Sequence, residues 1–202
     1  MRYKVPHQVF LLNGPPRCGK DTAALHLMNF YSNLRHRKMS APLKDAIHRM
    51  FMLSHDTITE LELPGNNALK DVPRLDLLGM SYRQALIWMS EECMKPRFGI
   101  DVFGKIMVNE LQKPTAAPFT VISDSGFKDE ALPIIKRYGA NNVHLFRILR
   151  PGCDFGGDSR SYWELEDACQ FQIIDNRFDR RLFGIDILRR VDAIMKVERV
   201  YE

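Results

Sequence analysis

The chain has few cysteines and no long hydrophobic run, and both absences exclude classes of protein. Its four cysteines, among 202 residues, lie far apart without paired spacing, so neither a disulfide framework nor a zinc site is predicted. No stretch approaches the roughly 20 apolar residues that a membrane-spanning helix needs. Residues 1–9 lack the apolar centre of a secretory signal. We therefore expect a cytoplasmic protein with no membrane partner.

The charge of the chain is also modest. Lys and Arg number 29 and Asp and Glu 25, which gives a formal net charge of +4. This excess does not indicate nucleic acid, because a pocket for a small polyanion such as a nucleotide also gathers Lys and Arg. The basic run Arg35–Lys38 is typical of a solvated face, so no nucleic-acid partner is predicted. The hydrophobic share of 45% and the length favour one globular domain, or one core with an inserted lobe.

The strongest local pattern lies between Val9 and Thr22. Gln8–Leu12 is a short apolar run, which predicts a strand buried on both faces of a sheet. Asn13–Gly19 is rich in turn residues, and Asp21–Tyr31 has apolar residues at helical spacing. A buried strand, a tight loop and a helix are therefore predicted to follow one another.

The loop in this pattern has the glycine and lysine frame of a phosphate-binding P-loop. Gly14 and Gly19 stand five residues apart, and Lys20 follows. Glycines let backbone N–H groups turn towards a phosphate, while the helix start and Lys20 add positive charge. The alternative is an ordinary glycine-rich turn with a solvated lysine. The residues predicted to bind the donor phosphates are Gly14, Arg17, Gly19, Lys20, Asp21 and Thr22.

Two places in the sequence are candidates for magnesium ligands. The common P-loop pattern has Ser or Thr after the lysine, whereas this chain has Asp21 and then Thr22, and either oxygen suits the cation. Asp124 ends the apolar run Phe119–Ser123, and open α/β sheets bind ligands at the carboxyl ends of their strands. Asp124 is therefore predicted to hold magnesium directly or through water. The alternative is a cap for a helix over Lys128–Tyr138.

The rest of the chain alternates between strand and helix patterns. This order predicts a three-layer α/β/α P-loop fold with a parallel sheet, made of one domain over residues 1–202. Its core comprises residues 1–41 and 112–202, and a mostly helical lobe for a second substrate comprises about 42–111. Further strands are expected at Arg37–Ala41, Asn142–Ile148 and Gln172–Ile174. Expected helices are Pro42–Leu53, a region from Ser81 that Pro96 breaks, Val102–Leu111 and Leu182–Val200, with an irregular connection over Leu61–Asp76.

A polar, glycine-rich stretch over about residues 150–163 is predicted to be a lid. It carries Arg150 and Arg160, and Arg147 precedes it. A lid closes over phosphates and excludes water, and arginine suits that task because its fork grips phosphate oxygens and keeps its charge. The alternative is a surface loop whose arginines have no common function.

Several separate stretches resemble one family, the bacteriophage deoxynucleoside monophosphate kinases. The distinctive ones are Gly-Lys-Asp-Thr at residues 19–22 and Ala-Pro-Leu-Lys-Asp-Ala at residues 41–46. The chain departs from the family at Gly126, where the family often has arginine. It departs again at Asp158-Ser159-Arg160, which lacks the family's lid histidine. Less distinctive matches are Arg83, Glu91, Arg97 and Asp101 in order and spacing, and Ile122-Ser123-Asp124 followed by Phe127 and Glu130.

The resemblance implies transfer of the γ-phosphoryl group of ATP, with Mg²⁺, to a deoxynucleoside monophosphate. Positioning dominates such a transfer, so no strong general base is required. The family is often dimeric, so a homodimer is one expectation, in the host cytoplasm if a phage encodes the chain. Alternatives are a P-loop kinase of the phosphomevalonate or dephospho-coenzyme A type, or a nucleotide-binding protein without activity. The residues implied for catalysis are Lys20, Arg147, Arg150 and Arg160; for the acceptor Lys44, Arg83, Glu91, Arg97 and Asp101; and for magnesium Asp21, Thr22 and Asp124.

Overall fold

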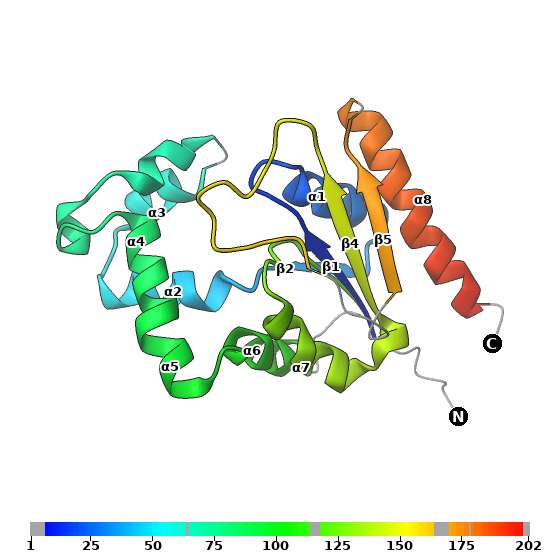
Figure 1. The fold of residues 1–202 in the computed structure, drawn as a ribbon, viewed down its shortest axis with the longest axis horizontal. Helices are drawn as coiled ribbons and strands as arrows, with labels where there is room; N and C mark the ends of the chain where they lie inside the picture. Colours follow the sequence, from blue (N-terminus) through cyan, green and yellow to red (C-terminus); the bar gives the residue numbers. More distant parts are fainter. Residues whose placement is uncertain (1–6, 64, 114–117, 164–169, 178, 200–202) are drawn as a thin grey trace.

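The computed structural model describes residues 7–63, 65–113, 118–163, 170–177 and 179–199 (Figure 1). Five strands form one all-parallel sheet in the order β2-β3-β1-β4-β5. The predicted α/β class with a parallel sheet is therefore confirmed. The strands are β1 (Gln8–Asn13), β2 (Leu34–Arg37), β3 (Phe119–Ile122), β4 (Val143–Leu149) and β5 (Gln170–Asp175).

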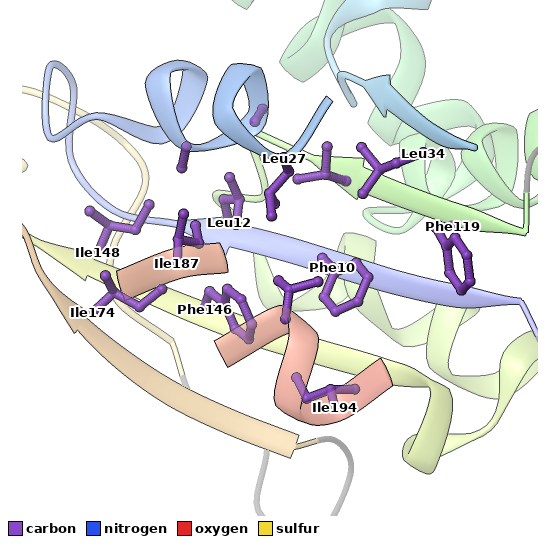
Figure 2. Packing of buried hydrophobic residues seen from close by; sticks show 14 of the residues in the cluster. Phe10, Leu12, Leu27, Leu34, Phe119, Phe146, Ile148, Ile174, Ile187 and Ile194 are labelled. Carbon is purple, nitrogen blue, oxygen red and sulfur yellow. The ribbon is translucent and has the colours of Figure 1, made fainter. Parts of the chain in front are cut away.

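One face of the sheet is covered by α1 (Lys20–Phe30) and α8 (Arg180–Arg199). Phe10 and Leu12 of β1 point to this face and are fully buried. Figure 2 shows Leu27 of α1 and Ile187 of α8 packed in the same cluster as these two strand residues. The predicted closing helix is confirmed as α8, although Val200, its expected last residue, lies outside the described residues.

The opposite face of the sheet is covered by α6 (Val102–Leu111) and α7 (Lys128–Tyr138). Val9 and Leu11 point to this face, so β1 alternates between two buried sides. Residues buried on both faces give a continuous apolar run, which is why this strand has no polar alternation. The molecule therefore has three layers, with the sheet between two pairs of helices.

The second strand lies three residues earlier than expected. The prediction placed it at Arg37–Ala41, whereas β2 covers Leu34–Arg37. The backbone N–H groups of Met39 and Ser40 donate to the carboxylate of Asp124 instead of to a neighbouring strand. The pairing of β2 therefore ends at Arg37, because the N–H groups of Met39 and Ser40 donate to Asp124 and not to a strand.

The chain between β2 and β3 is mostly helical, as expected, and has a hydrophobic core of its own. Ile47, Leu61, Leu77 and Tyr82 are fully buried in it. The sequence did not predict α3, and the expected irregular connection contains two 3-10 segments. The elements are α2 (Ala41–Met50), α3 (His55–Glu62), η1 (Asn66–Asp71), η2 (Leu75–Leu77), α4 (Tyr82–Ile87), η3 (Trp88–Met94) and α5 (Lys95–Phe98).

Pro96 does not break the helix that starts after Ser81, so that expectation is wrong. Helical backbone continues from α4 through η3 into α5, and η3 is a π-helix. A π-helical turn shifts the hydrogen-bond frame by one residue and widens the backbone. Pro96 then falls in the first turn of α5, a position where a missing N–H is tolerated.

The strand order places three loops at one edge of the sheet. β1 lies in the centre, with β3 on one side and β4 on the other, and all strands run in the same direction. The connections that leave β1, β3 and β4 therefore emerge together, where open α/β sheets bind their ligands. Figure 1 shows the 150–163 segment, in yellow, running from the end of β4 towards the helical lobe and back. Among the described residues, no helix has the length and apolarity to cross a membrane.

Candidate functional site

The loop between β1 and α1, residues 14–19, is packed too closely for larger side chains at its glycines. A Cβ on Gly14 would lie 2.7 Å from the carbonyl oxygen of Ile148 in β4. Gly19 has a φ of +108°, and a Cβ there would lie 2.6 Å from Nδ2 of Asn176. The first amide groups of α1 then have no acceptor within the helix and point towards the loop. We call residues 14–19 the β1–α1 loop.

Lys20 folds back over this loop. Its ammonium donates to the carbonyl oxygens of Gly14 and Pro15, at 2.6 Å each. Burial lowers the pKa of Lys20. The amine thus lies above the loop, where a bound phosphate oxygen would replace the carbonyl contacts.

Two residues from distant strands brace the β1–α1 loop. Asn176, which follows β5 and is buried, donates from Nδ2 to the carbonyl oxygen of Cys18 at 2.8 Å. Arg150, which follows β4, donates to the carbonyl oxygen of Arg17 at 3.0 Å. Arg17 itself is exposed and has a φ of +65°. Arg150 therefore shapes the loop in this structure, and its side chain lies next to the predicted phosphate position.

The first turn of α1 offers two oxygens to a cation. Asp21 receives hydrogen bonds from Lys38 (2.9 Å) and Ser123 (2.8 Å) on Oδ1, and no described residue bonds to its Oδ2. Burial raises the pKa of Asp21, but the hydrogen bond and charge of Lys38 and the bond from Ser123 outweigh it, so the net pKa is lowered. The hydroxyl of Thr22 makes no hydrogen bond to a described residue. Both predicted ligands therefore keep an oxygen for a metal.

Asp124 caps a helix, but not the expected one. Its carboxylate accepts from the N–H of Met39 (2.6 Å), the N–H of Ser40 (3.0 Å) and the hydroxyl of Ser40 (2.6 Å). These groups begin α2, whereas a cap for α7 was the predicted alternative. Both carboxylate oxygens are occupied by α2, so a metal near Asp124 is best reached through a bound water.

Among the described residues, no group of three or more His, Cys, Asp or Glu side chains is placed to hold a metal ion. A magnesium ion at this edge would take its remaining ligands from water and from phosphate oxygens. That is the usual arrangement of this cation in phosphoryl-transfer sites. The oxygens of Asp21 and Thr22 beside the start of α1 fit such a partly hydrated ion.

Four cations from β2–α2, η1 and α4 act on one another electrostatically. Burial lowers the pKa of Lys70, Glu62 raises it, and the charges of Lys44, Arg83 and Lys38 lower it further. Each of these three cations also holds a carboxylate. The pairs are Lys38 with Asp21 (2.9 Å), Lys44 with Glu62 (2.5 Å) and Arg83 with Asp71 (2.7 Å). We call Lys38, Lys44, Lys70 and Arg83 the basic cluster.

The 150–163 segment is packed against the sheet edge. Arg147 of β4 donates to the carbonyl oxygen of Trp163 at 3.1 Å and lies over the ring of Tyr162. Trp163 is buried and donates to the carbonyl oxygen of Ser125. Arg147 therefore anchors the end of the segment in this structure.

Arg160, in the same segment, lies at the middle of the sheet edge. Its guanidinium binds Asp158 through two hydrogen bonds, of 2.8 and 2.5 Å. Its charge reaches Lys20 on one side and Asp124 on the other. Of the three predicted arginines, Arg150 contacts the β1–α1 loop directly, and Arg160 is the one whose charge acts on both Lys20 and Asp124.

Glu130, in the first turn of α7, is a buried carboxyl at the same edge. It is 4% exposed, and burial raises the pKa of Glu130 to about 8. Lys95 and Arg160 lower this pKa and Asp124 and Glu91 raise it. Glu91, a predicted acceptor ligand, is bound to Lys95 at 2.6 Å and so lies beside Glu130.

Two predicted acceptor ligands are not brought to this edge. Asp101 pairs with Lys105 (2.7 Å) and borders a groove between α6 and α7. Arg97 is exposed and makes no hydrogen bond or ion pair with a described residue. Neither Arg97 nor Asp101 is therefore joined to the β1–α1 loop or to the basic cluster by a polar contact between described residues.

Comparisons with known proteins add little to this geometry. No family model and no curated protein matches the chain. A solved structure of an unliganded sugar kinase from Janibacter sp. is 15% identical and aligns over 94% of this chain and 98% of its own. Its TM-score of 0.42 is too low to support an argument about fold or activity.

Sequence analysis assigned no role at the site to five residues that the structure places there. Lys38 was assigned to a solvated face, yet it binds Asp21. Lys70 lies in a stretch without periodicity, and nothing in its neighbourhood distinguishes it from a surface lysine. Ser123 and Asn176 each follow a buried strand, and that position was a usable signal. Glu130 was noted only through the family resemblance.

Replacement of Asn176 by alanine is expected to loosen the β1–α1 loop. The change removes the donor to the buried carbonyl of Cys18, and an unsatisfied buried group of this kind costs about 1–3 kcal/mol. For the Mg-ATP that the predicted P-loop would bind, the dissociation constant measured by titration calorimetry should rise roughly tenfold. Arg177→Ala is the matched control, because Arg177 is adjacent and exposed and, among the described residues, is bound only to Asp175. Equal affinities for the two variants would contradict the bracing role.

Replacement of Glu130 by glutamine is expected to change how stability depends on pH. The pKa is higher in the folded chain than in the unfolded chain, so folding takes up a proton and stability falls as pH rises from about 4.5 to about 8. Glutamine removes this loss. Urea unfolding should show Glu130→Gln more stable than the wild type by at least about 1 kcal/mol at pH 8, and similar at pH 5.

The control for Glu130→Gln is Asn109→Ala, an exposed change in α6 without a titratable group. Its stability relative to the wild type should be the same at both pH values. If the stability difference between Glu130→Gln and the wild type is the same at pH 5 and at pH 8, the carboxyl of Glu130 is charged in the folded protein at both pH values.

Proposed function

We propose that this chain is an ATP-dependent kinase whose acceptor already carries a phosphate, with a deoxynucleoside monophosphate as the substrate. The observation that supports it most is the ion pair between Lys38 and Asp21, at 2.9 Å, which joins two groups of cations. Lys20 lies over the β1–α1 loop, and the basic cluster lies on the side of the helical lobe. Two cationic positions suit two anionic substrates, whereas an acceptor with only a hydroxyl group would need one.

The two groups are joined through Asp21 and the 150–163 segment. Lys38 of the basic cluster binds Asp21, which follows Lys20 directly. Arg160 acts electrostatically on Lys20, and its partner Asp158 is within reach of Arg83. A donor phosphate at Lys20 and an acceptor phosphate at the basic cluster would then meet at Arg160.

In this proposal the β1–α1 loop is a P-loop. Its amides and Lys20 hold the donor phosphates, and Lys20 exchanges its two carbonyl contacts for phosphate oxygens. Asp21 and Thr22, and Asp124 through water, would hold a magnesium ion, which would supply positive charge to neutralise the transferring group. Arg160 and Lys20 stabilise the charge that spreads over that group, and Arg147 and Arg150 keep the surrounding loops in position.

The acceptor needs no strong base, because its phosphate is already an anion. Lys44, Lys70 and Arg83 are placed to receive it, and each charge-assisted contact is stronger than a neutral hydrogen bond. The choice of a deoxynucleotide, rather than another phosphorylated metabolite, rests on the resemblance of residues 19–22 and 41–46 to phage enzymes.

The proposal is tested by ADP production from Mg-ATP with a panel of acceptors. The panel contains dAMP, dGMP, dCMP, dTMP, their ribose counterparts, phosphomevalonate and dephospho-coenzyme A. We expect turnover with at least one deoxynucleotide and its loss in Lys20→Ala, because Lys20 contacts the transferred phosphate in the proposal. Turnover only with a non-nucleotide acceptor would support a kinase with a different substrate. Tight ATP binding without any acceptor-dependent turnover would refute the kinase.

Variants of the lobe distinguish the acceptor site that we propose at the basic cluster from the one implied by the family resemblance. Lys70→Ala and Arg83→Ala should each raise the acceptor KM tenfold or more, because a lost charge-assisted bond is worth about 1.5–3 kcal/mol. The KM for ATP should stay within about twofold of the wild type, since these residues lie on the lobe side. Arg97→Ala is the matched control and should alter neither KM. A raised acceptor KM in Arg97→Ala, with Lys70→Ala unaffected, would favour the family's arrangement instead.

A further inference from the structure

Arg160 occupies the volume in which a side chain at position 126 would lie. A Cβ on Gly126 would be 2.2 Å from Cδ of Arg160, 2.6 Å from its Cγ and 3.2 Å from its Cβ. The φ of Gly126 is outside the left-handed region, so its backbone is one that any residue adopts. Space, and not conformation, therefore requires glycine here.

The stem of Arg160 lies on this glycine, and its charged end is held between the loops of the site. The side chain is 26% exposed, and its charge reaches Lys20 in α1 and Asp124 at the end of β3. The charge of Arg160 also acts on Glu130 in α7, where it lowers the pKa of the carboxyl. Arg160 of the 150–163 segment therefore fills the space that a side chain at position 126, in the loop after β3, would otherwise occupy.

Asp158 binds this guanidinium in the manner of a substrate anion. Its two oxygens accept from Nε and Nη2 of Arg160, and one also accepts from the backbone N–H of Arg160 at 2.9 Å. The Asp158 side chain is 14% exposed, and Arg83 of the basic cluster lies within its electrostatic reach. Arg–carboxylate and Arg–phosphate pairs share this two-bond geometry. The carboxylate therefore lies where an anion between Arg160 and Arg83 would bind.

We propose that Gly126 and Arg160 form one functional unit. Because Gly126 has no side chain, the stem of Arg160 fits beside it and its guanidinium reaches the acceptor's phosphate. Asp158 occupies the position of that phosphate until the acceptor binds. This inference deepens the proposed function and rests on it. Arg160 keeps its proton throughout, and binding exchanges one anion on its guanidinium for another. Gly126 is a positioning residue, because it acts only through Arg160.

Alanine at position 126 should remove Arg160 from the site. We expect Gly126→Ala and Arg160→Ala each to lower kcat roughly 100-fold, which is typical for the loss of one preorganised donor to the transition state. The double variant should be no worse than either single one, because both changes remove the same group. Ser159→Ala, an exposed change in the same segment, is the matched control and should keep wild-type kcat. Losses that multiply in the double variant would refute the unit.

An exchange of the two residues distinguishes this role from a structural one. An arginine at 126 starts in the volume that the Arg160 stem now fills, so Gly126→Arg combined with Arg160→Ala should recover at least tenfold in kcat over Arg160→Ala. Gly126→Arg alone should be poorly active, since two side chains then compete for one space. If Gly126 only serves folding, the combined variant will be no better than Arg160→Ala, and the proposal fails.

Asp158→Asn tests the place-holding role. The neutral amide competes less well for Arg160, so the acceptor KM should fall severalfold while the KM for ATP stays unchanged. An acceptor KM that is unchanged or raised would show that Asp158 does not share the acceptor's position.

A measurement without turnover keeps this inference separate from the kinase itself. The Arg160 Nε–H resonance in a ¹⁵N spectrum should be visible in the wild-type protein, shift on addition of inorganic phosphate, and disappear in Gly126→Ala. If the acceptor panel shows no turnover but phosphate moves this resonance, the proposed function fails and the anion position stands. If phosphate leaves the resonance unmoved in a folded wild-type protein, the anion position is wrong.

Discussion

The carboxylate of Asp124 joins the sheet to the helical lobe, and the arrangement of the site depends on this contact. Asp124 lies at the end of β3, and its two oxygens take three donors at the start of α2, 84 and 85 residues earlier. A carboxylate at a helix start is favoured both by the free N–H groups and by the positive end of the helix. Because Lys38 precedes this helix and Lys44 lies in its first turn, the same contact sets where the basic cluster meets the sheet edge.

Every cation that we assign to the acceptor side, except Lys70, already holds a carboxylate. Lys38, Lys44, Arg83 and Arg160 are paired with Asp21, Glu62, Asp71 and Asp158, respectively. Neutralised in this way, several like charges can lie close together before an anion binds. Only the pair of Arg83 with Asp71 has both side chains largely exposed, and such a pair contributes little to folding stability. The pairs of Lys44 with Glu62 and of Arg160 with Asp158 are mostly buried, so each carboxylate there compensates a cation that has lost part of its hydration.

The parts of the site that follow from local sequence were predicted, and those that depend on chain-distant contacts were not. β1, the β1–α1 loop and α1 follow from apolar runs, glycine spacing and helical periodicity, all within residues 8–31. Lys70 joins the basic cluster only through the packing of the lobe, so no neighbour in the sequence marks it. Asp124 was recognised as a possible cap, but which helix start it meets is decided by the fold. The error at Pro96 has the same origin, because helical backbone continues through η3 into α5 and places Pro96 in the first turn of α5.

Three glycines around the sheet edge reserve space for groups from elsewhere in the chain. Gly14 admits the carbonyl of Ile148, Gly19 the amide of Asn176, and Gly126 the stem of Arg160. The first two bring β4 and the end of β5 against the β1–α1 loop, which keeps that loop in one shape without a ligand. The third brings a residue of the 150–163 segment to the loop after β3. Gly14 and Gly19 were recognised from their spacing to Lys20, whereas the role of Gly126 depends on Arg160, a residue 34 positions later in the chain, so nothing in the neighbouring sequence marks it.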